Sequence, residues 1–168
     1  IVFSFGKHGF DRHAASFNPE DLNLSLRDKT IVVTGANSGI GKETTRALAR
    51  LGAHVIMVCR NPERGEQAQK ELLADGSISN NHGRLSLVLG DLSDLESVDR
   101  VVAELTGPID VLIHNAGALV DERMMSKQGV ELTVATHVTG PLRLSAKCMP
   151  KFATGARIIW VSSGGMYL

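Results

Sequence analysis

Cysteine and aromatic residues are scarce in this sequence, and both shortages restrict what the protein can be. The 168 residues include two cysteines, and only 4% of the residues are aromatic. Cys59 and Cys148 provide neither a disulfide framework nor the ligand spacing of a metal site. We therefore expect no bound metal, two reduced thiols in a buried core, and an intracellular, cytoplasmic protein.

Net charge and long apolar runs are also missing. Eighteen basic residues balance eighteen acidic ones, so no overall field attracts nucleic acid or an anionic membrane. No apolar stretch approaches the roughly 20 residues that a membrane span requires. A hydrophobic content of 43% and a length of 168 residues fit one ordinary globular domain. These features argue against a nucleic-acid partner and against a membrane-spanning segment.

A glycine-rich loop between a predicted strand and a predicted helix is the most informative stretch. The β-branched run that ends at Thr34 leads into the loop, and a helical pattern begins at Ile40. This order places a helix N-terminus beside a tight turn, which is an arrangement that binds a pyrophosphate. Gly35 would permit the turn, Gly39 the approach of a ligand to the backbone, and Gly41 close packing of helix on strand. The loop residues predicted to bind a cofactor are Gly35, Asn37, Ser38, Gly39, Ile40 and Gly41.

The phosphate-binding loop of nucleoside triphosphatases fits the same stretch poorly. That motif ends in Gly-Lys-Ser/Thr at a fixed distance from its first glycine. Here Gly41-Lys42 is followed by Glu43 and lies one residue too far from Gly35. The loop therefore favours a dinucleotide over a nucleoside triphosphate.

Predicted strands and helices alternate through the rest of the chain. After the first strand, apolar runs predict strands at 54–59, 85–89, 109–113 and 157–162, and periodic patterns predict helices at 62–76, 95–105 and 129–152. Asn61 is a predicted helix cap, and Ser93 stands at capping-box spacing from Glu96. A polar surface loop is expected at 77–83, and Pro141 should kink the last helix at a cost of ~3 kcal/mol. Five strands joined by helices predict an α/β fold with a doubly wound parallel sheet.

The chain divides at about residue 28. Residues 1–28 have no clear period and hold most of the phenylalanines, so we expect an N-terminal extension that packs against something. Docking on the domain and the end of a lost anchor are the alternatives, which leaves membrane association of this segment open. Residues 29–168 form the predicted nucleotide-binding domain. Because the chain begins at Ile1 and ends early, we expect a piece of a longer protein, incomplete at its C-terminus.

Polar or glycine residues follow every predicted strand at one edge of the sheet, where doubly wound folds bind their ligands. Beyond the glycine loop these segments are Cys59-Arg60-Asn61, Asp91-Leu92, Asn115-Ala116-Gly117 and Ser162-Ser163-Gly164-Gly165. An acidic residue after the second strand would favour NAD, but Arg60 stands there instead. A guanidinium suits the 2′-phosphate of NADP, although a solvated arginine is the alternative. NADP is therefore predicted over NAD.

These motifs resemble a known family. Thr34–Gly41, Asp91-Leu92, Asn115–Gly117 and Val161-Ser162-Ser163 match, in order and spacing, the short-chain dehydrogenase/reductase family over about residues 28–168. Val58–Asn61 and the ending Val161–Met166 are similar to its retinol-dehydrogenase-like group. The resemblance implies a Rossmann-type sheet, truncated here after the fifth strand. It also implies NAD(P)-dependent interconversion of a carbonyl and an alcohol, with a small lipophilic substrate, and it leaves a homo-oligomer open.

The resemblance further implies roles for single residues. The glycine loop would bind the pyrophosphate and Asp91 the adenine, with Leu92 a further cofactor-binding residue, and the Asn115-Ala116-Gly117 turn would brace the sheet beside the cofactor. Ser163 would hydrogen-bond the substrate oxygen.

Two departures from the family affect the expected chemistry. The family's catalytic Tyr and Lys are not present in this chain, because Tyr167 is too close to Ser163 and no lysine follows it; the chain alone should be inactive. His137 occupies the position of the family's proton-relaying Asn; an imidazole can also relay protons, but it is larger than the amide. The alternative function is therefore a non-catalytic dinucleotide-binding module that senses redox state or binds a partner. His114, at another family Asn position, is expected to be a packing variant.

Overall fold

The structure, a computed structural model, describes residues 7–163 and contains two compact units. One unit is Leu26–Val161, and the other comprises the terminal segments, described for 7–25 and 162–163. In the terminal unit, α1 (Lys7–Ala14) precedes the 3₁₀ turn η2 (Pro19–Leu22), which Asn18 caps by accepting the Glu20 N–H at 3.1 Å. Docking of this segment on the domain stays a prediction. Gly164, Gly165, Met166 and Tyr167, which the sequence analysis singled out, lie outside the described residues.

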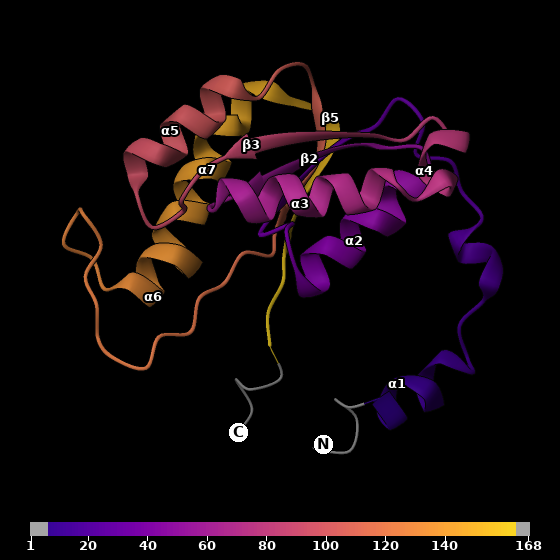
Figure 1. The fold of residues 1–168 in the computed structure, drawn as a ribbon, viewed down its shortest axis with the longest axis horizontal. Helices are drawn as coiled ribbons and strands as arrows, with labels where there is room; N and C mark the ends of the chain where they lie inside the picture. The colour runs from indigo at the N-terminus through magenta and orange to yellow at the C-terminus, as the bar shows by residue number, and fades with distance from the viewer. Residues whose placement is uncertain (1–6, 164–168) are drawn as a thin grey trace. The chain divides into compact units, whose positions relative to one another are not determined.

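A five-stranded parallel sheet forms the centre of the larger unit (Figure 1). The strands are β1 (Thr30–Thr34), β2 (His54–Cys59), β3 (Arg84–Leu89), β4 (Ile109–His114) and β5 (Phe152–Trp160). Their order in the sheet is β3-β2-β1-β4-β5. The chain therefore adds β2 and β3 on one side of β1, and then β4 and β5 on its other side. This confirms the predicted doubly wound Rossmann-type fold, and it places the switch point where the glycine loop leaves β1.

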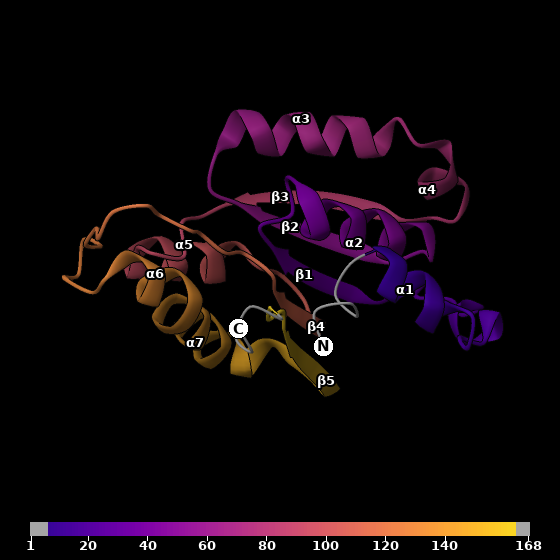
Figure 2. The same cartoon turned by 90° about the horizontal axis from the view of Figure 1, so that it is seen from below.

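Helices cover both faces of the sheet (Figure 2). α2 (Gly39–Arg50), α3 (Pro62–Leu73) and α4 (Gly76–Asn80) pack on one face, and α5 (Leu95–Glu104) and α7 (Gly140–Cys148) on the other. Side chains of β2 alternate between the two cores, with Met57 facing α2 and α3, and Val58 facing α5 and α7. Burial of β2 on both faces explains its uninterrupted apolar sequence. Among residues 7–163, no helix combines the length and apolarity needed to span a membrane.

The predicted cap of α3 is confirmed, whereas that of α5 is wrong. Asn61 Oδ1 accepts the Arg64 N–H at 2.8 Å. At α5 the cap is Asp94, which accepts the Glu96 N–H at 3.1 Å, while Ser93 Oγ donates to Asp91 Oδ1 at 2.7 Å. Ser93 is thus occupied by the turn that ends β3, and the adjacent carboxylate takes its place.

The polar stretch after α3 is also not the predicted loop. It forms the short helix α4, capped by Asp75, and it buries Ile78, of which 1% is exposed. One buried isoleucine anchors an otherwise polar segment, so composition alone misassigned it.

The predicted long helix is divided into segments. Glu131 caps the single turn α6 (Leu132–Val134), a π-helical turn spans Ala135–Thr139, and α7 and a 3₁₀ turn η4 (Met149–Lys151) follow. In the π turn the Gly140 N–H bonds the Ala135 carbonyl, which widens the helix just before Pro141. The helix therefore accommodates the proline ring without a break. β5 then begins at Phe152, earlier than predicted, with an irregular register against β4 between Ile109 and Val111.

Candidate functional site

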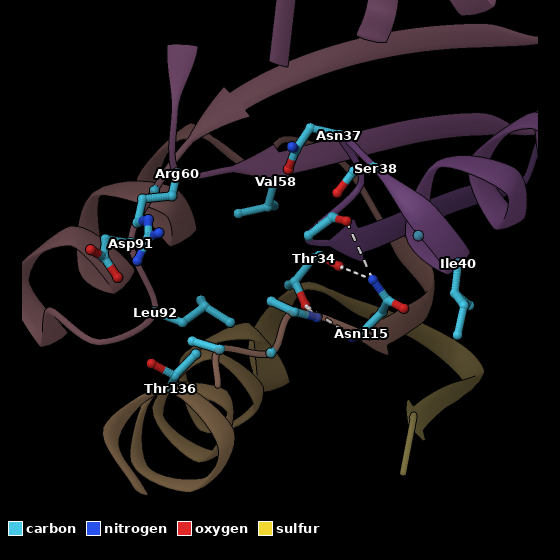
Figure 3. A pocket seen from close by; sticks show the side chains of 16 residues that line it. Thr34, Asn37, Ser38, Ile40, Val58, Arg60, Asp91, Leu92, Asn115 and Thr136 are labelled. Carbon is cyan, nitrogen blue, oxygen red and sulfur yellow. Dashed lines mark hydrogen bonds between the residues drawn. The ribbon is translucent and has the colours of Figure 1, made fainter. Parts of the chain in front are cut away.

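A cavity of about 380 Å³ opens at the carboxyl edge of the sheet, around the switch point (Figure 3). All residues predicted to bind the cofactor line it except Gly39. The lining residues that the sequence predicted are Gly35, Asn37, Ser38, Ile40, Gly41, Arg60, Asp91, Leu92, Asn115, Ala116 and Gly117. Segments far apart in the chain therefore converge on one hollow, as the strand-end argument requires.

The glycine loop is shaped by two close backbone approaches. Gly35 has φ +67°, and a Cβ atom there would lie 2.8 Å from the Cα of Ala116. A Cβ atom on Gly41 would lie 2.4 Å from both the Gly35 carbonyl oxygen and the Asn115 Nδ2. Larger residues at either position would push the loop away from β4. Gly39, with φ +51°, has open space around its Cβ position, as expected for a surface that a ligand approaches.

The N-terminus of α2 is suited to an anion. The first-turn N–H groups of a helix have no partner within the helix, and they carry the positive end of its dipole. Ser38 is the N-cap residue, yet its side chain makes no capping hydrogen bond. Its hydroxyl and the neighbouring amides therefore remain able to bind phosphate oxygens at the floor of the cavity.

Thr34 and Asn115 join the two strands at the switch point. Thr34 Oγ1 accepts the backbone N–H groups of Asn115 and Ala116 at 3.1 and 3.0 Å. Asn115 Nδ2 donates in return to the carbonyl oxygens of Thr34 and Gly35 at 3.0 and 3.3 Å, as the dashed lines of Figure 3 show. These bonds fix the glycine loop against the Asn115–Gly117 turn.

Arg60 and Asp91 lie at the other end of the cavity. Asp91 Oδ1 accepts from the backbone N–H and the hydroxyl of Ser93 at 2.9 and 2.7 Å, which holds the turn after β3. Arg60 is exposed, extends in the direction of Asp91 in Figure 3, and forms no ion pair with any carboxylate of the described part of the chain. Its guanidinium is therefore available to an anionic ligand.

A second hollow adjoins this end, and an anchored loop forms one of its walls. Residues 115–131 connect β4 to α6. The far end of this segment is held by Asp94, whose Oδ2 lies 2.6 Å from Lys127 Nζ and whose Oδ1 lies 3.3 Å from Gln128 Nε2. The Lys127 ammonium is the main cause that lowers the pKa of Asp94 to about 2. Lys127 and Met125 line this hollow together with Arg60 and Asp91.

His137 lies beside the cavity and does not line it. Its Nδ1 is 2.8 Å from the carbonyl oxygen of Thr133, so Nδ1 must donate there, and Nε2 is the acceptor in the neutral ring. Nε2 lies 2.9 Å from the Cβ position of Gly117. The structure thus brings His137 to the Asn115–Gly117 turn. Ser163 belongs to the terminal unit, and its role stays a prediction.

Several lining residues were not predicted from the sequence. They are Thr34, Val58, Gly90, Ala118 and Thr136. The first four adjoin strand ends that were recognised, so widening each strand-end window by one residue would have found them. Thr136 is on the π turn, and no local signal connects it with the sheet edge.

The remaining metal-binding and thiol side chains of the described residues form neither a metal site nor a reactive thiol. In the region 7–163, no three His, Cys, Asp or Glu side chains are grouped so that they could hold a metal ion. Burial raises the pKa of Cys59 and of Cys148 to about 11, so both thiols are unreactive core groups at neutral pH.

A doubly wound parallel sheet, a glycine loop at its switch point and a helix N-terminus facing a cavity define a dinucleotide-binding fold. Residues 29–166 match the family model described as short chain dehydrogenase. The chain belongs to this family of NAD(P)-binding oxidoreductases, as its motifs predicted.

Relatives and solved structures agree with this assignment. The chain is 34% identical to dehydrogenase/reductase SDR family member 12 of Bos taurus, covering 96% of this chain and 51% of the relative. A blue fluorescent protein from a metagenomic library, solved with NADPH, has a TM-score of 0.69 and 26% identity, covering 84% of this chain and 58% of that one. A 3-oxoacyl (acyl-carrier-protein) reductase of Agrobacterium tumefaciens with NADP bound has a TM-score of 0.69 and 25% identity, covering 89% and 57%. The chain spans about half the length of the curated relatives it matches.

Proposed function

We propose that the whole protein is an NADP(H)-dependent oxidoreductase that interconverts a carbonyl and an alcohol, and that this chain supplies its cofactor-binding part. The observation that carries the choice of NADP is Arg60, whose guanidinium makes no ion pair with residues 7–163 and follows β2 without a carboxylate at that strand end. The NADPH-bound and NADP-bound structures of similar proteins support it. NAD, the less favoured cofactor, would leave this guanidinium without a partner.

Different residues of the cavity would bind different parts of a dinucleotide. The N-terminus of α2 and the Ser38 hydroxyl would bind the pyrophosphate, and Arg60 the 2′-phosphate. Leu92 is buried, with 5% of its surface exposed, and would pack against the adenine beside Asp91. The Asn115–Gly117 turn, fixed to β1 through Thr34, would set the position of the nicotinamide half.

A bound nicotinamide supplies or accepts a hydride, and the substrate oxygen must then gain or lose a proton. Ser163 would hydrogen-bond that oxygen. His137 would contribute a proton acceptor, because the Thr133 carbonyl holds its Nδ1–H and leaves Nε2 as the lone pair beside Gly117.

Nucleotide binding by the whole protein tests this function. We expect NADPH to bind at least ten-fold more tightly than NADH, since a charge-assisted bond to the 2′-phosphate is worth ~1.5–3 kcal/mol. Titration by nicotinamide fluorescence, with competition by 2′,5′-ADP and 5′-AMP, measures the difference. Equal affinities would contradict the NADP assignment, and no binding would contradict the function itself. Tight binding without turnover of a panel of lipophilic aldehydes and ketones would favour the non-catalytic alternative.

A further inference from the structure

His114 is a buried histidine that connects three elements of the larger unit. It is the last residue of β4, and 4% of it is exposed. Its Nε2 lies 2.7 Å from the hydroxyl of Ser145 in α7, and its ring packs on Trp160 of β5 with 4.4 Å between ring centroids. Its carbonyl accepts the Val161 N–H at 2.9 Å. A residue so connected fixes the distance between the sheet and α7.

The other ring nitrogen of His114 identifies the tautomer. Within the described residues, Nδ1 is a buried side-chain atom with no hydrogen-bond partner. An unpartnered buried N–H costs more than a bare lone pair, so the proton is on Nε2 and is donated to Ser145 Oγ. Burial also lowers the pKa of His114 to about 4, which keeps the ring neutral.

Two of the elements joined at His114, β4 and α7, lead to the candidate site. The next residue along the chain is Asn115, the first of the turn that Thr34 and the glycine loop hold from the other side. Ser145 is in the helix that continues from the π turn, where His137 meets Gly117. The contact between His114 and Ser145 therefore spans the two elements that meet at Gly117.

We propose that His114 is a positioning residue of the site: through Ser145 and Trp160 it holds the Asn115–Gly117 turn in place relative to the helix that carries His137. The inference rests on the proposed function, because it assigns the nicotinamide half of the dinucleotide to this turn. Arg60 and Asp91, at the other end of the cavity, are not bound to His114. The two halves of the ligand should therefore respond differently when His114 is changed.

The test compares NADP⁺ with 2′,5′-ADP, which lacks the nicotinamide half, in variants of the whole protein. In His114→Gln the side-chain amide reaches the place of Nε2 and can still donate to Ser145, whereas in His114→Asn it ends at the place of Nδ1. We expect His114→Asn and Ser145→Ala each to weaken NADP⁺ by about three- to ten-fold, the worth of one hydrogen bond, with 2′,5′-ADP unchanged. His114→Gln should bind both ligands like the unchanged protein. The double variant His114→Asn/Ser145→Ala should bind NADP⁺ no more weakly than either single variant, because both substitutions remove the same hydrogen bond.

A second histidine–serine pair provides the matched control. His54 Nε2 lies 2.7 Å from Ser86 Oγ in β2 and β3, and neither residue lines the cavity. Ser86→Ala removes the same kind of bond and should leave both affinities unchanged.

Each remaining outcome contradicts the inference in a different way. Equal losses for NADP⁺ and 2′,5′-ADP would show a general weakening of the fold, and an unchanged NADP⁺ affinity would show no positioning role. Both results would leave the proposed function intact. If the unchanged protein bound neither ligand, the proposed function would fail and this inference with it. Should His114→Asn not fold, Ser145→Ala carries the comparison, because Ser145 is only partly buried.

Discussion

Gly117 and His137 meet beside the cavity, with the imidazole Nε2 2.9 Å from the place that a Cβ atom on Gly117 would take. Gly117 is in the turn that follows β4, and His137 is in the π turn. A side chain at 117 would therefore meet the end of the His137 ring, which would have to move to admit it.

This contact predicts a suppressor. Gly117→Ala should weaken NADP⁺ binding to the whole protein by at most a few-fold, because the added methyl group displaces the exposed His137 ring, at a cost of up to about one hydrogen bond to the Thr133 carbonyl. His137→Asn shortens the opposing side chain, so the double variant should recover most of the affinity. Calorimetric titration of the three variants measures this, and a double variant weaker than Gly117→Ala would contradict the contact.

The charge of Arg60 predicts a change in cofactor preference. Arg60→Gln should weaken NADPH by about ten-fold or more and leave NADH nearly unchanged, since only NADPH presents a 2′-phosphate. Lys70→Gln removes the same charge from exposed α3 and serves as the control. Equal losses for the two cofactors in Arg60→Gln would refute the assigned role.

Gly41 predicts a local failure of packing. In Gly41→Ala the new methyl group would lie 2.4 Å from the Gly35 carbonyl and from Asn115 Nδ2, both of which are fixed by the switch-point bonds. We expect a loss of ~1–3 kcal/mol in the free energy of unfolding, together with weaker dinucleotide binding. Gly76→Ala, also near a helix start but with open space at its Cβ position, should cost nothing comparable. Denaturant unfolding of the two variants makes the comparison.

His114 and Trp160 predict a loss of stability in mild acid. Burial lowers the pKa of folded His114 to about 4 from an ordinary 6.5, so the unfolded chain takes up the proton first as pH falls. The stabilisation is complete above pH ~6.5 and is lost progressively toward pH ~4. His54, whose pKa burial also lowers, acts in the same direction. Between these two pH values, the free energy of unfolding of His114→Gln should therefore depend less steeply on pH than that of the unchanged protein, while the His54 contribution remains.

Fluorescence measures the same event in the folded state. Trp160 is the only tryptophan of the sequence, and a protonated imidazole in contact with an indole quenches its emission. Quenching with a midpoint near pH 4 is expected in the unchanged protein and should be absent in His114→Gln.

The open side of β5 predicts self-association of a protein made of these 168 residues alone. Within residues 7–163 β5 is an edge strand, and Ile158, Ile159, Trp160 and the following Val161 are each 38–46% exposed. Unpaired backbone groups beside apolar side chains favour pairing with another chain. We expect oligomers in size-exclusion chromatography and a shift toward monomer in Ile159→Lys. A monomeric, soluble protein without this substitution would show that the edge is harmless.

The sequence predicted the sheet and most of the cavity because parallel strands end at one edge. Apolar runs locate such strands, and the residues that follow them must then converge, which is why Arg60 and Asn115 could be assigned to one site from the sequence. Thr136 could not be assigned, since its place depends on how a helix packs against the sheet. Periodicity says which face of a helix is buried and does not say what that face meets.

Local errors had a different cause. Ser93 and Asp94 are both good caps, and the choice depended on the Asp91 turn, which had already engaged Ser93. Ile78 was overlooked because one apolar residue among polar neighbours shows no period, although in α4 it is fully buried against the core beneath α2 and α3. The spacing of capping residues in the sequence does not show which of two adjacent groups, here Ser93 and Asp94, forms the capping hydrogen bond.

The π turn sets the rotational phase of the helix that contains it. Thr136, Gly140, Leu144 and Cys148 are all buried and follow one another at intervals of four residues. In a uniform α-helix, each interval would rotate the next side chain by about 40° from the one before. The wider turn at Ala135–Thr139 cancels most of the first step, so one helix can present Thr136 to the cavity and Leu144 to the core. Deleting a single residue within the turn should therefore replace the bond from the Gly140 N–H to the Ala135 carbonyl by an ordinary α-helical bond, leave α6 and α7 in nearly the same rotational phase, and draw Thr136 away from the cavity wall.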